Sequence, residues 1–276
     1  MRAFQACLWL SLLSLCCITM PSRSATPVAT PSQPQMPSAP APDVEAWLRT
    51  CPGAGLRNAK LYAARALGIE LMKRSADHNQ ARSTLDIDRQ FAPVLEQLRK
   101  RGLTNDELAQ MEDAVLGLTE LTAQNPVASQ VESVVRMAES VAATCLHAAG
   151  RLGAGAKNGT DNTLLEHMGS ILSLSQRLAM ERLVSAFDTR QRTPAGANYV
   201  AQVDERLAAL QQVAGTNQAL LNTHALLQAQ WYFLRRAVQN TTNTGRQPVD
   251  DVGRTSEIMF EVLEAEMRRL GRHPGA

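Results

Sequence analysis

Two cysteines, Cys51 and Cys145, have the clearest potential for covalent chemistry. The other three cysteines of the chain lie within its first 17 residues. No histidine or further cysteine stands at metal-ligand spacing from either residue. An even pair of cysteines in an oxidising compartment favours a disulfide. We therefore predict that Cys51 and Cys145 are joined.

The usual sequence motifs of enzymes are absent from the chain. No G-x-S-x-G, H-E-x-x-H or P-loop motif occurs. The histidines His147, His167 and His224 are scattered along the sequence, and we interpret them as ordinary helix residues. Acidic pairs such as Asp250-Asp251 suit helix starts or exposed faces. We expect no enzymatic activity, no cofactor and no metal.

The N-terminal segment has the layout of a secretory signal peptide. Arg2 precedes an apolar core at residues 6–20, and small residues follow the core. We predict that residues 1–24 are a signal peptide, cleaved near Ser24. The core is shorter than the roughly 20 residues that a bilayer-spanning helix needs, which favours cleavage. Retention as an anchor and lipidation of one of its cysteines stay open as alternatives.

Residues 25–43 are rich in Pro, Ala, Ser and Thr. Such a segment has too little apolar surface to offset the entropy of ordering it, so we predict a linker of polyproline character. The predicted signal peptide holds two basic residues and no acid, which accounts for the net charge of +2. The remaining chain is neutral, which argues against nucleic-acid binding. We predict a periplasmic or secreted protein.

From residue 43 onward, apolar residues recur at intervals of three and four, the spacing of amphipathic helices. Aromatic residues make up only 4% of the chain, which favours helices over strands. Thr104 and Glu107 form a predicted capping box, and Pro93 predicts a helix start or kink. We predict an all-α fold with helices at residues 54–76, 84–101, 104–124, 127–151, 162–188, 195–214, 217–241 and 249–271.

The chain shows signs of two similar halves. Ala63-Ala64-Arg65 corresponds to Ser175-Gln176-Arg177, 112 residues later. Four antiparallel helices joined by short loops form an up-down bundle, and each half contains four predicted helices. We therefore predict two four-helix bundles in tandem, at residues 44–153 and 160–272. One longer continuous bundle is the alternative.

One short segment resembles a known sensory family. It reads Gly169-Ser-Ile-Leu-Ser-Leu-Ser-Gln-Arg177-Leu-Ala and resembles the first helix of the PilJ-type sensory domain, whose pattern is close to G-R-Q-R-M-L-S-Q-R-M-A. That domain is the N-terminal domain of type IV pili methyl-accepting chemotaxis transducers, and nitrate/nitrite sensor kinases carry a related one. The resemblance covers residues 162–271 and is weaker over 54–153. The identical positions are Gly169, Leu174, Ser175, Gln176, Arg177 and Ala179.

This resemblance implies a ligand site beside the motif helix. In the nitrate sensors, an arginine at the fourth motif position contacts the anion at a dimer interface, whereas this chain has Leu172 there. We therefore expect that nitrate does not bind at this motif. Arg177 would face a cleft with Ser173 and Gln176. The alternative is a structural role, in which Arg177 pairs with Glu181 or caps a neighbouring helix.

In the first half, the fourth motif position is Lys60, with Arg57 one turn earlier. Both cations could meet an anion as point charges. The alternative reading is two solvated side chains at a helix start. The candidate ligand-binding residues are therefore Arg57, Lys60, Arg65, Ser173, Gln176 and Arg177.

Two functions of different classes follow from the resemblance. In the first, the chain is a sensory or ligand-binding module related to chemotaxis and type IV pilus signalling. It would lack a transmembrane output of its own and present a small solute, or itself, to a membrane-bound sensor. In the second, it is an interaction protein that binds an envelope or pilus component through a helical face. A homodimer is compatible with either function.

The predicted helix 162–188 should be the central helix of the second bundle and bury one apolar stripe. Leu172 lies off that stripe, and we expect it to line the groove in which relatives bind their ligand. We also expect Trp231 and Tyr232 to pack in the core or along a groove. The residues of the predicted stripe are Leu164, Met168, Ile171, Leu174, Leu178 and Leu183.

Overall fold

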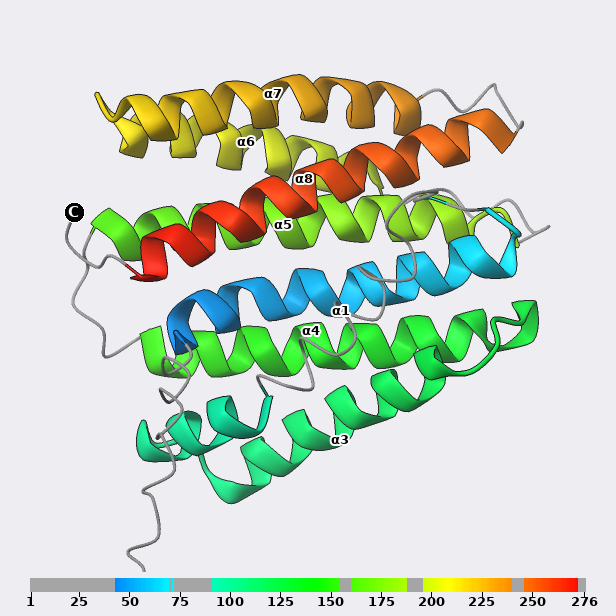
Figure 1. Cartoon of the computed structure of the whole chain (residues 1–276), viewed down its shortest axis with the longest axis horizontal. Coiled ribbons are helices and arrows are strands. Elements are labelled where there is room, and N and C mark those ends of the chain that lie inside the picture. The colour runs from blue at the N-terminus through cyan, green and yellow to red at the C-terminus, as the bar shows by residue number, and fades with distance from the viewer. Residues whose placement is uncertain are drawn as a thin grey trace, which may run out of the picture. The chain divides into compact units, whose positions relative to one another are not determined.

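The computed structural model describes residues 43–69, 71, 91–153, 160–187, 196–239 and 246–272. Within these ranges the regular secondary structure is helical and contains no strand (Figure 1). The predicted all-α fold is therefore confirmed. The predicted signal peptide and nearly all of the predicted linker lie outside the described residues, so both stay predictions.

The first helix, α1 (Val44–Ala66), begins ten residues before the predicted start at residue 54. Asp43 caps it, because its carboxylate accepts hydrogen bonds from the backbone N–H groups of Glu45 and Ala46. Pro52 lies inside the helix without ending it. The apolar residues before Pro52 are buried and hold the first turns in place. The predicted start at residue 54 is therefore wrong.

The end of α1 also differs from the prediction. Gly68 has a φ of +68°, which glycine adopts without steric cost. The N–H groups of Gly68 and Ile69 donate to the carbonyls of Arg65 and Ala64, which forms a Schellman motif. The helix therefore stops at Ala66 rather than continuing to residue 76.

The later helices follow the predicted spacing more closely. Residues 91–100 are helical, and the capping box of Thr104 and Glu107 is present at the start of α3. A 3-10 turn, η1 (Ala128–Gln130), precedes α4. The remaining helices are α3 (Asn105–Ala123), α4 (Val131–Gly153), α5 (Thr160–Val184), α6 (Gly196–Ala214), α7 (Gln218–Gln239) and α8 (Arg246–Arg272).

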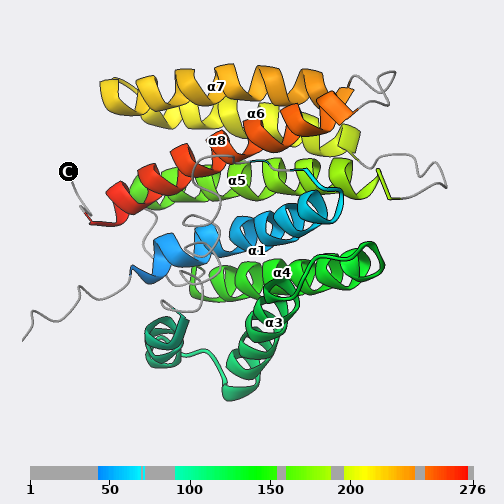
Figure 2. The same cartoon turned by 45° about the vertical axis from the view of Figure 1, so that its right-hand side comes forward.

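Helix α1 is the centre of the packing. It contacts α4 on one side and α5 and α8 on the other, while α3 packs on α4, and α6 and α7 continue beyond α5 and α8 (Figures 1 and 2). Gly55 lies against Val141 of α4, and Gly169 of α5 lies against the backbone of Arg49. These glycines allow close helix approach on both sides of α1. Because α1 contacts helices of both sequence halves, the division at residues 153 and 160 stays a prediction.

Helix α5 is buried on more than the one predicted stripe. Five of the six predicted core residues are fully or almost fully buried, and so is Leu172, with an exposed fraction of 0%. Leu172 packs into the space that Gly53 leaves on α1. The predicted groove position for Leu172 is therefore wrong, because α1 covers that face. Leu174, predicted to be buried, is only half-buried. The five buried residues of the predicted stripe are Leu164, Met168, Ile171, Leu178 and Leu183.

The predicted disulfide is present between Cys51 and Cys145. Their Cα atoms lie 6.2 Å apart, and the bond links α1 to α4 across 94 residues of sequence. Both cysteines are buried. A disulfide of this kind is typical of proteins that fold in an oxidising compartment.

Replacing both cysteines with alanine should lower the free energy of unfolding by about 2–4 kcal/mol, because the crosslink restricts the unfolded chain. Paired urea melts of the wild type and the Cys51→Ala/Cys145→Ala variant measure this difference. The wild type reduced under denaturing conditions should match the variant. Equal stability of all three forms would contradict the prediction.

Candidate functional site

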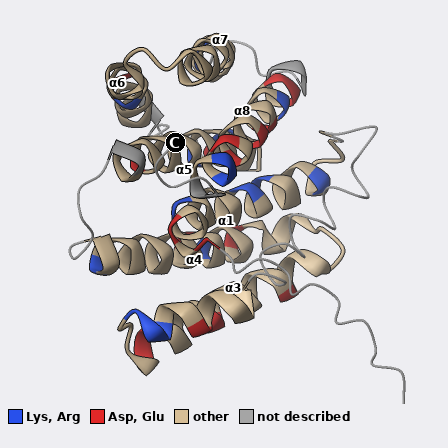
Figure 3. Ribbon diagram, turned by 60° about the vertical axis from the view of Figure 1, so that its left-hand side comes forward, with Lys and Arg blue, Asp and Glu red and all other residues tan. Residues whose placement is uncertain are grey.

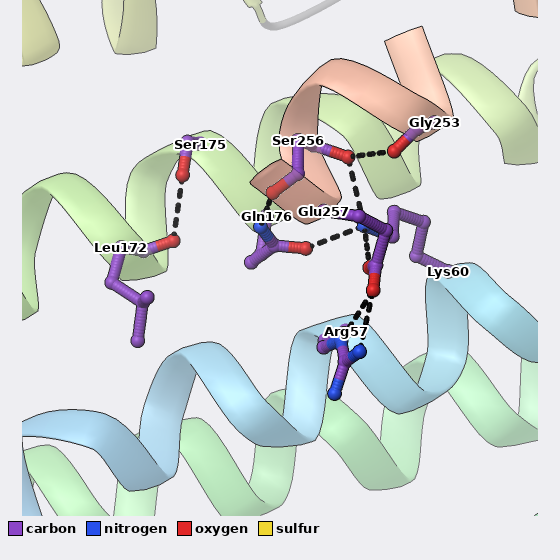
Figure 4. Close-up of polar contacts among 8 residues, drawn as sticks. All are labelled: Arg57, Lys60, Leu172, Ser175, Gln176, Gly253, Ser256 and Glu257. Atoms are coloured by element: carbon purple, nitrogen blue, oxygen red, sulfur yellow. Dashed lines mark hydrogen bonds and ion pairs between the residues drawn. The ribbon is translucent and has the colours of Figure 1, made fainter. Parts of the chain in front are cut away.

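Five polar side chains converge where α1, α5 and α8 meet (Figure 4). Arg57 and Lys60 come from α1, Gln176 from α5, and Ser256 and Glu257 from α8. All five are buried, and Lys60 has an exposed fraction of 0%. We call this set the polar cluster. The alternative reading of Arg57 and Lys60 as solvated residues at a helix start is wrong, because both lie in the interior of α1.

Lys60 contacts three of the other four residues of the polar cluster. Its Nζ donates hydrogen bonds to Gln176 Oε1 at 2.7 Å and Ser256 Oγ at 2.8 Å. The third partner of Nζ is Glu257 Oε1, which also makes the pair a salt bridge. These three acceptors use the full donor capacity of an ammonium group. Lys60 therefore joins all three helices at one atom.

The remaining bonds orient the partners of Lys60. Gln176 Nε2 donates to the backbone oxygen of Ser256 at 2.7 Å, and Ser256 Oγ donates to the backbone oxygen of Gly253 at 2.8 Å. Arg57 Nε donates to Glu257 Oε2 at 2.7 Å, and its Nη2 lies 2.5 Å from the same oxygen. Each polar group thus has a fixed direction, as buried networks require.

The polar cluster contains two cationic side chains and one carboxylate. Burial lowers the pKa of Lys60 to about 8, although Glu257 opposes that change. Burial alone would raise the pKa of Glu257, but Lys60 and Arg57 outweigh it and lower the pKa to about 2. Arg57 also lies over the ring of Phe260, 4.4 Å from its centroid. Glu257 forms ion pairs with both cations, so the polar cluster holds one cation more than it holds carboxylates.

Acid should weaken the fold through Glu257. Its pKa is about 2 in the folded chain, against an ordinary 4.5. Between these values the unfolded chain binds the proton more readily, so this stabilisation is complete above pH 4.5 and disappears as pH falls toward 2. A Glu257→Gln variant should show a flatter dependence of unfolding free energy on pH in this window, measured by urea melts. An unchanged slope would contradict this assignment.

The other three predicted ligand-binding residues lie outside the polar cluster. Arg177 is half-buried on α5 and pairs with Glu139 of α4 rather than with Glu181. Ser173 is half-buried and has no contact with the cluster among the described bonds. Arg65 donates to the backbone oxygen of Thr122 at 3.1 Å.

Arg177 also lies over the ring of Tyr199 of α6, 5.7 Å from its centroid. Because its partners come from α4 and α6, Arg177 connects the two sequence halves on another face of α5. This geometry suits a structural role. Arg177 does not share a cleft with Gln176, because Gln176 is directed toward Lys60 while Arg177 is directed toward Glu139.

Two members of the polar cluster, Ser256 and Glu257, were not among the predicted residues. Glu257 stands beside the apolar stripe of α8, one turn from Phe260 and one from Gly253. An acidic residue flanked in this way by apolar and small residues is the sequence signal that could have singled it out. The partner on α1 could not be found from that spacing alone.

The structure agrees with the prediction for Trp231 and not with the prediction for Tyr232. Trp231 is buried, and its Nε1 donates to Asp204 Oδ1 at 2.6 Å. His224 is buried and bonds to the backbone oxygen of Leu207 at 3.1 Å. Tyr232, expected to pack in the core or along a groove, is instead 59% exposed. That expectation for Tyr232 is wrong, because it lies on the solvent face of α7.

The part of the chain that the structure describes contains no group of three or more His, Cys, Asp or Glu residues able to hold a metal ion. Comparison with models of known protein families, with curated proteins and with solved structures finds no match to this chain. The polar cluster is therefore interpreted from its own geometry. That geometry can hold an anionic group between Arg57 and Lys60, where Glu257 lies.

Proposed function

We propose that the chain is an exported sensory or ligand-binding module, similar in role to PilJ-type domains, that responds to a small anion. The observation that carries the proposal is the polar cluster, in which Arg57, Lys60 and Gln176 converge from both sequence halves. Lys60 and Gln176 occupy positions of the sensory motif in the first and second halves, and Arg57 lies one turn before Lys60. Their meeting at one point supports the correspondence between the halves.

Glu257 would act as an internal competitor of the ligand. Its carboxylate accepts from both Arg57 and Lys60, as a small oxyanion would. A ligand that took its place would release α8 from α1, because Glu257 is the charged link between these helices. A ligand shifts such an equilibrium only by its difference in affinity for the two states. The excess positive charge of Arg57 and Lys60 over Glu257 would provide that difference.

One further observation supports export. The Cys51–Cys145 disulfide fits an oxidising compartment. None of the described helices combines the length and apolar character that crossing a bilayer requires. In this proposal the partner is a membrane-bound sensor or a pilus component, and the signal is the position of α8.

A thermal-shift screen of small anions, amino acids and purines tests the proposal, because a ligand that binds only the folded state raises its melting temperature. A ligand of the polar cluster should raise the melting temperature of the wild type and not that of Lys60→Met. Lys100→Met is the matched control, since Lys100 is exposed, and it should respond like the wild type. A shift that persists in Lys60→Met, or no shift with any anion, would argue against this site.

The second candidate is an interaction protein that binds an envelope or pilus component. It is favoured by Tyr232 and Phe233 of α7, which are 59% and 57% exposed. Exposed aromatic side chains on one face are typical of interaction surfaces. This candidate needs no ligand at the polar cluster, so a negative thermal-shift screen would not argue against it.

A further inference from the structure

Helix α7 exposes an apolar strip. Leu226, Tyr232 and Phe233 are 44%, 59% and 57% exposed. The exposed residues Ala225 and Ala229 connect them along the same helix face. The rings of Tyr232 and Phe233 meet edge to face, with centroids 5.6 Å apart. We call these five residues the α7 strip.

The charges beside the α7 strip have one sign. Helix α7 contains no aspartate or glutamate. Arg235 pairs with Asp204 at 2.9 Å, whereas the exposed Arg236 forms no ion pair within the described part of the chain. Arg236, which has no ion-pair partner among the described residues, therefore stands one turn beyond the two aromatic rings.

Helix α3 has the complementary surface. Its charged residues are all acidic, and its exposed face carries Leu116, which is 52% exposed. Glu112 and Asp113 lie one turn before Leu116 and Glu120 one turn after it, all three exposed. None of the three forms an ion pair among the described residues. Figure 3 shows acidic segments along α3, whereas most of α7 carries no charge.

The acidic residue near the end of α3 is unfavourable within its own helix. A carboxylate at Glu120 lies close to the negative end of the helix dipole. Asp106 and Glu107, by contrast, suit the helix start. The dipole therefore accounts for the acids of the first turn and not for Glu120. A cation from outside the chain would give Glu120 a favourable partner.

We infer that the α7 strip of one copy of this chain docks on α3 of a second copy. With Leu116 placed against Tyr232 and Phe233, Arg236 stands one turn, about 5.4 Å, from the aromatic rings. An acid stands one turn from Leu116 on either side, so Arg236 meets a carboxylate in a parallel or an antiparallel pairing. The apolar and the ionic contacts form together.

The contact has to join different copies. Helices α3 and α7 lie at opposite edges of the helix array (Figures 1 and 2), and α3 packs on α4 while α7 packs on α6 and α8. Each copy therefore presents one donor and one acceptor surface. Such a heterologous contact joins copies head to tail. It produces rings where the rotation between copies closes and open chains where it does not.

A membrane surface is the competing occupant of the α7 strip, and the charges favour it less. Attraction to anionic lipid grows with the number of basic residues at the surface. Arg236 is the single cation of α7 free of an ion pair in the described chain. The acidic face of α3 offers three carboxylates for that one arginine, together with Leu116.

Sedimentation velocity of the full-length protein over a concentration series tests the inference. We expect the weight-average sedimentation coefficient to rise with concentration beyond that of a dimer. The rise should be larger at about 0.02 M salt than at about 0.5 M, because salt screens exposed charges. A wild type that sediments as a monomer throughout would overturn the inference.

Charge exchange identifies the two surfaces. Arg236→Glu, and separately Glu112→Lys/Asp113→Lys/Glu120→Lys, should each weaken self-association about tenfold or more, through like-charge contact. Mixing the two variants should restore association, since each then has a complementary partner. Restored association also shows that both variants are folded. No recovery on mixing, with native helix content by circular dichroism, would overturn the pairing.

The apolar part has its own control. Phe233→Ser should weaken association, whereas Ile258→Ser should not, because Ile258 is a similarly exposed residue of α8. Equal effects would contradict a specific α7 contact. Binding to anionic vesicles by a chain that stays monomeric would assign the α7 strip to lipid instead. This inference is independent of the polar cluster, so the thermal-shift result cannot decide it.

Discussion

Replacing Glu257 with alanine is expected to lower the free energy of unfolding by about 3–5 kcal/mol, the usual cost of removing one partner of a buried ion pair. Arg57 and Lys60 would remain inside the protein without a counter-charge, since Glu257 is the carboxylate that both contact. Gln176 and Ser256 would still accept from Lys60, but neither carries charge. Urea melts at neutral pH measure the loss.

The control for this change is Glu261→Ala, which removes an exposed carboxylate from the same helix and should have little effect. Adding Lys60→Met to Glu257→Ala should recover part of the lost stability, because one unpaired cation is removed. Formate should stabilise the Glu257→Ala variant more than the wild type, since it can occupy the vacated position. A loss no larger than that of Glu261→Ala would mean that solvent reaches the polar cluster.

The helices of this protein were predictable from local sequence because their signals are local. The three-and-four spacing of apolar residues and the capping box of Thr104 and Glu107 each act within a few residues. The start of α1 was not predictable in this way. Pro52 is a boundary signal locally, but burial of the preceding turn against other helices overrides it.

The polar cluster was predictable in part, for a related reason. The resemblance to the sensory motif pointed to Lys60 and Gln176, and to Arg57 one turn before Lys60, yet it could not show that they touch. Lys60 meets Gln176 across 116 residues and Glu257 across 197. Such contacts depend on how α1, α5 and α8 pack, which the periodicity of any one helix does not contain.

The same limit explains the error at Leu172. A single apolar stripe assumes that a helix has one buried face, but α5 packs against α1, α6 and α8. Positions between the stripes, including Leu172, Ser175 and Gln176, are therefore covered as well. The apolar residues of α5 are not confined to one stripe, although most of the helix is buried. Such a pattern indicates that the helix is covered on several sides.

Replacing Leu172 with arginine is accordingly expected to remove most of the folded population. Leu172 has an exposed fraction of 0% and fills the space beside Gly53. An unpaired buried cation costs several kcal/mol even after the structure relaxes. Domains are stable by only about 5–15 kcal/mol in total. Circular dichroism and thermal melts of Leu172→Arg should show loss of the cooperative transition.

Two milder substitutions separate burial from charge. Leu172→Ala leaves a cavity between α1 and α5 and should cost about 2–5 kcal/mol, as large-to-small core changes do. Leu174→Ala removes the same atoms from a half-buried position and should cost clearly less. If Leu172→Arg instead melted like the wild type, Leu172 would line an open groove. The contact between α1 and α5, and with it the meeting of Lys60 and Gln176, would then be incorrect.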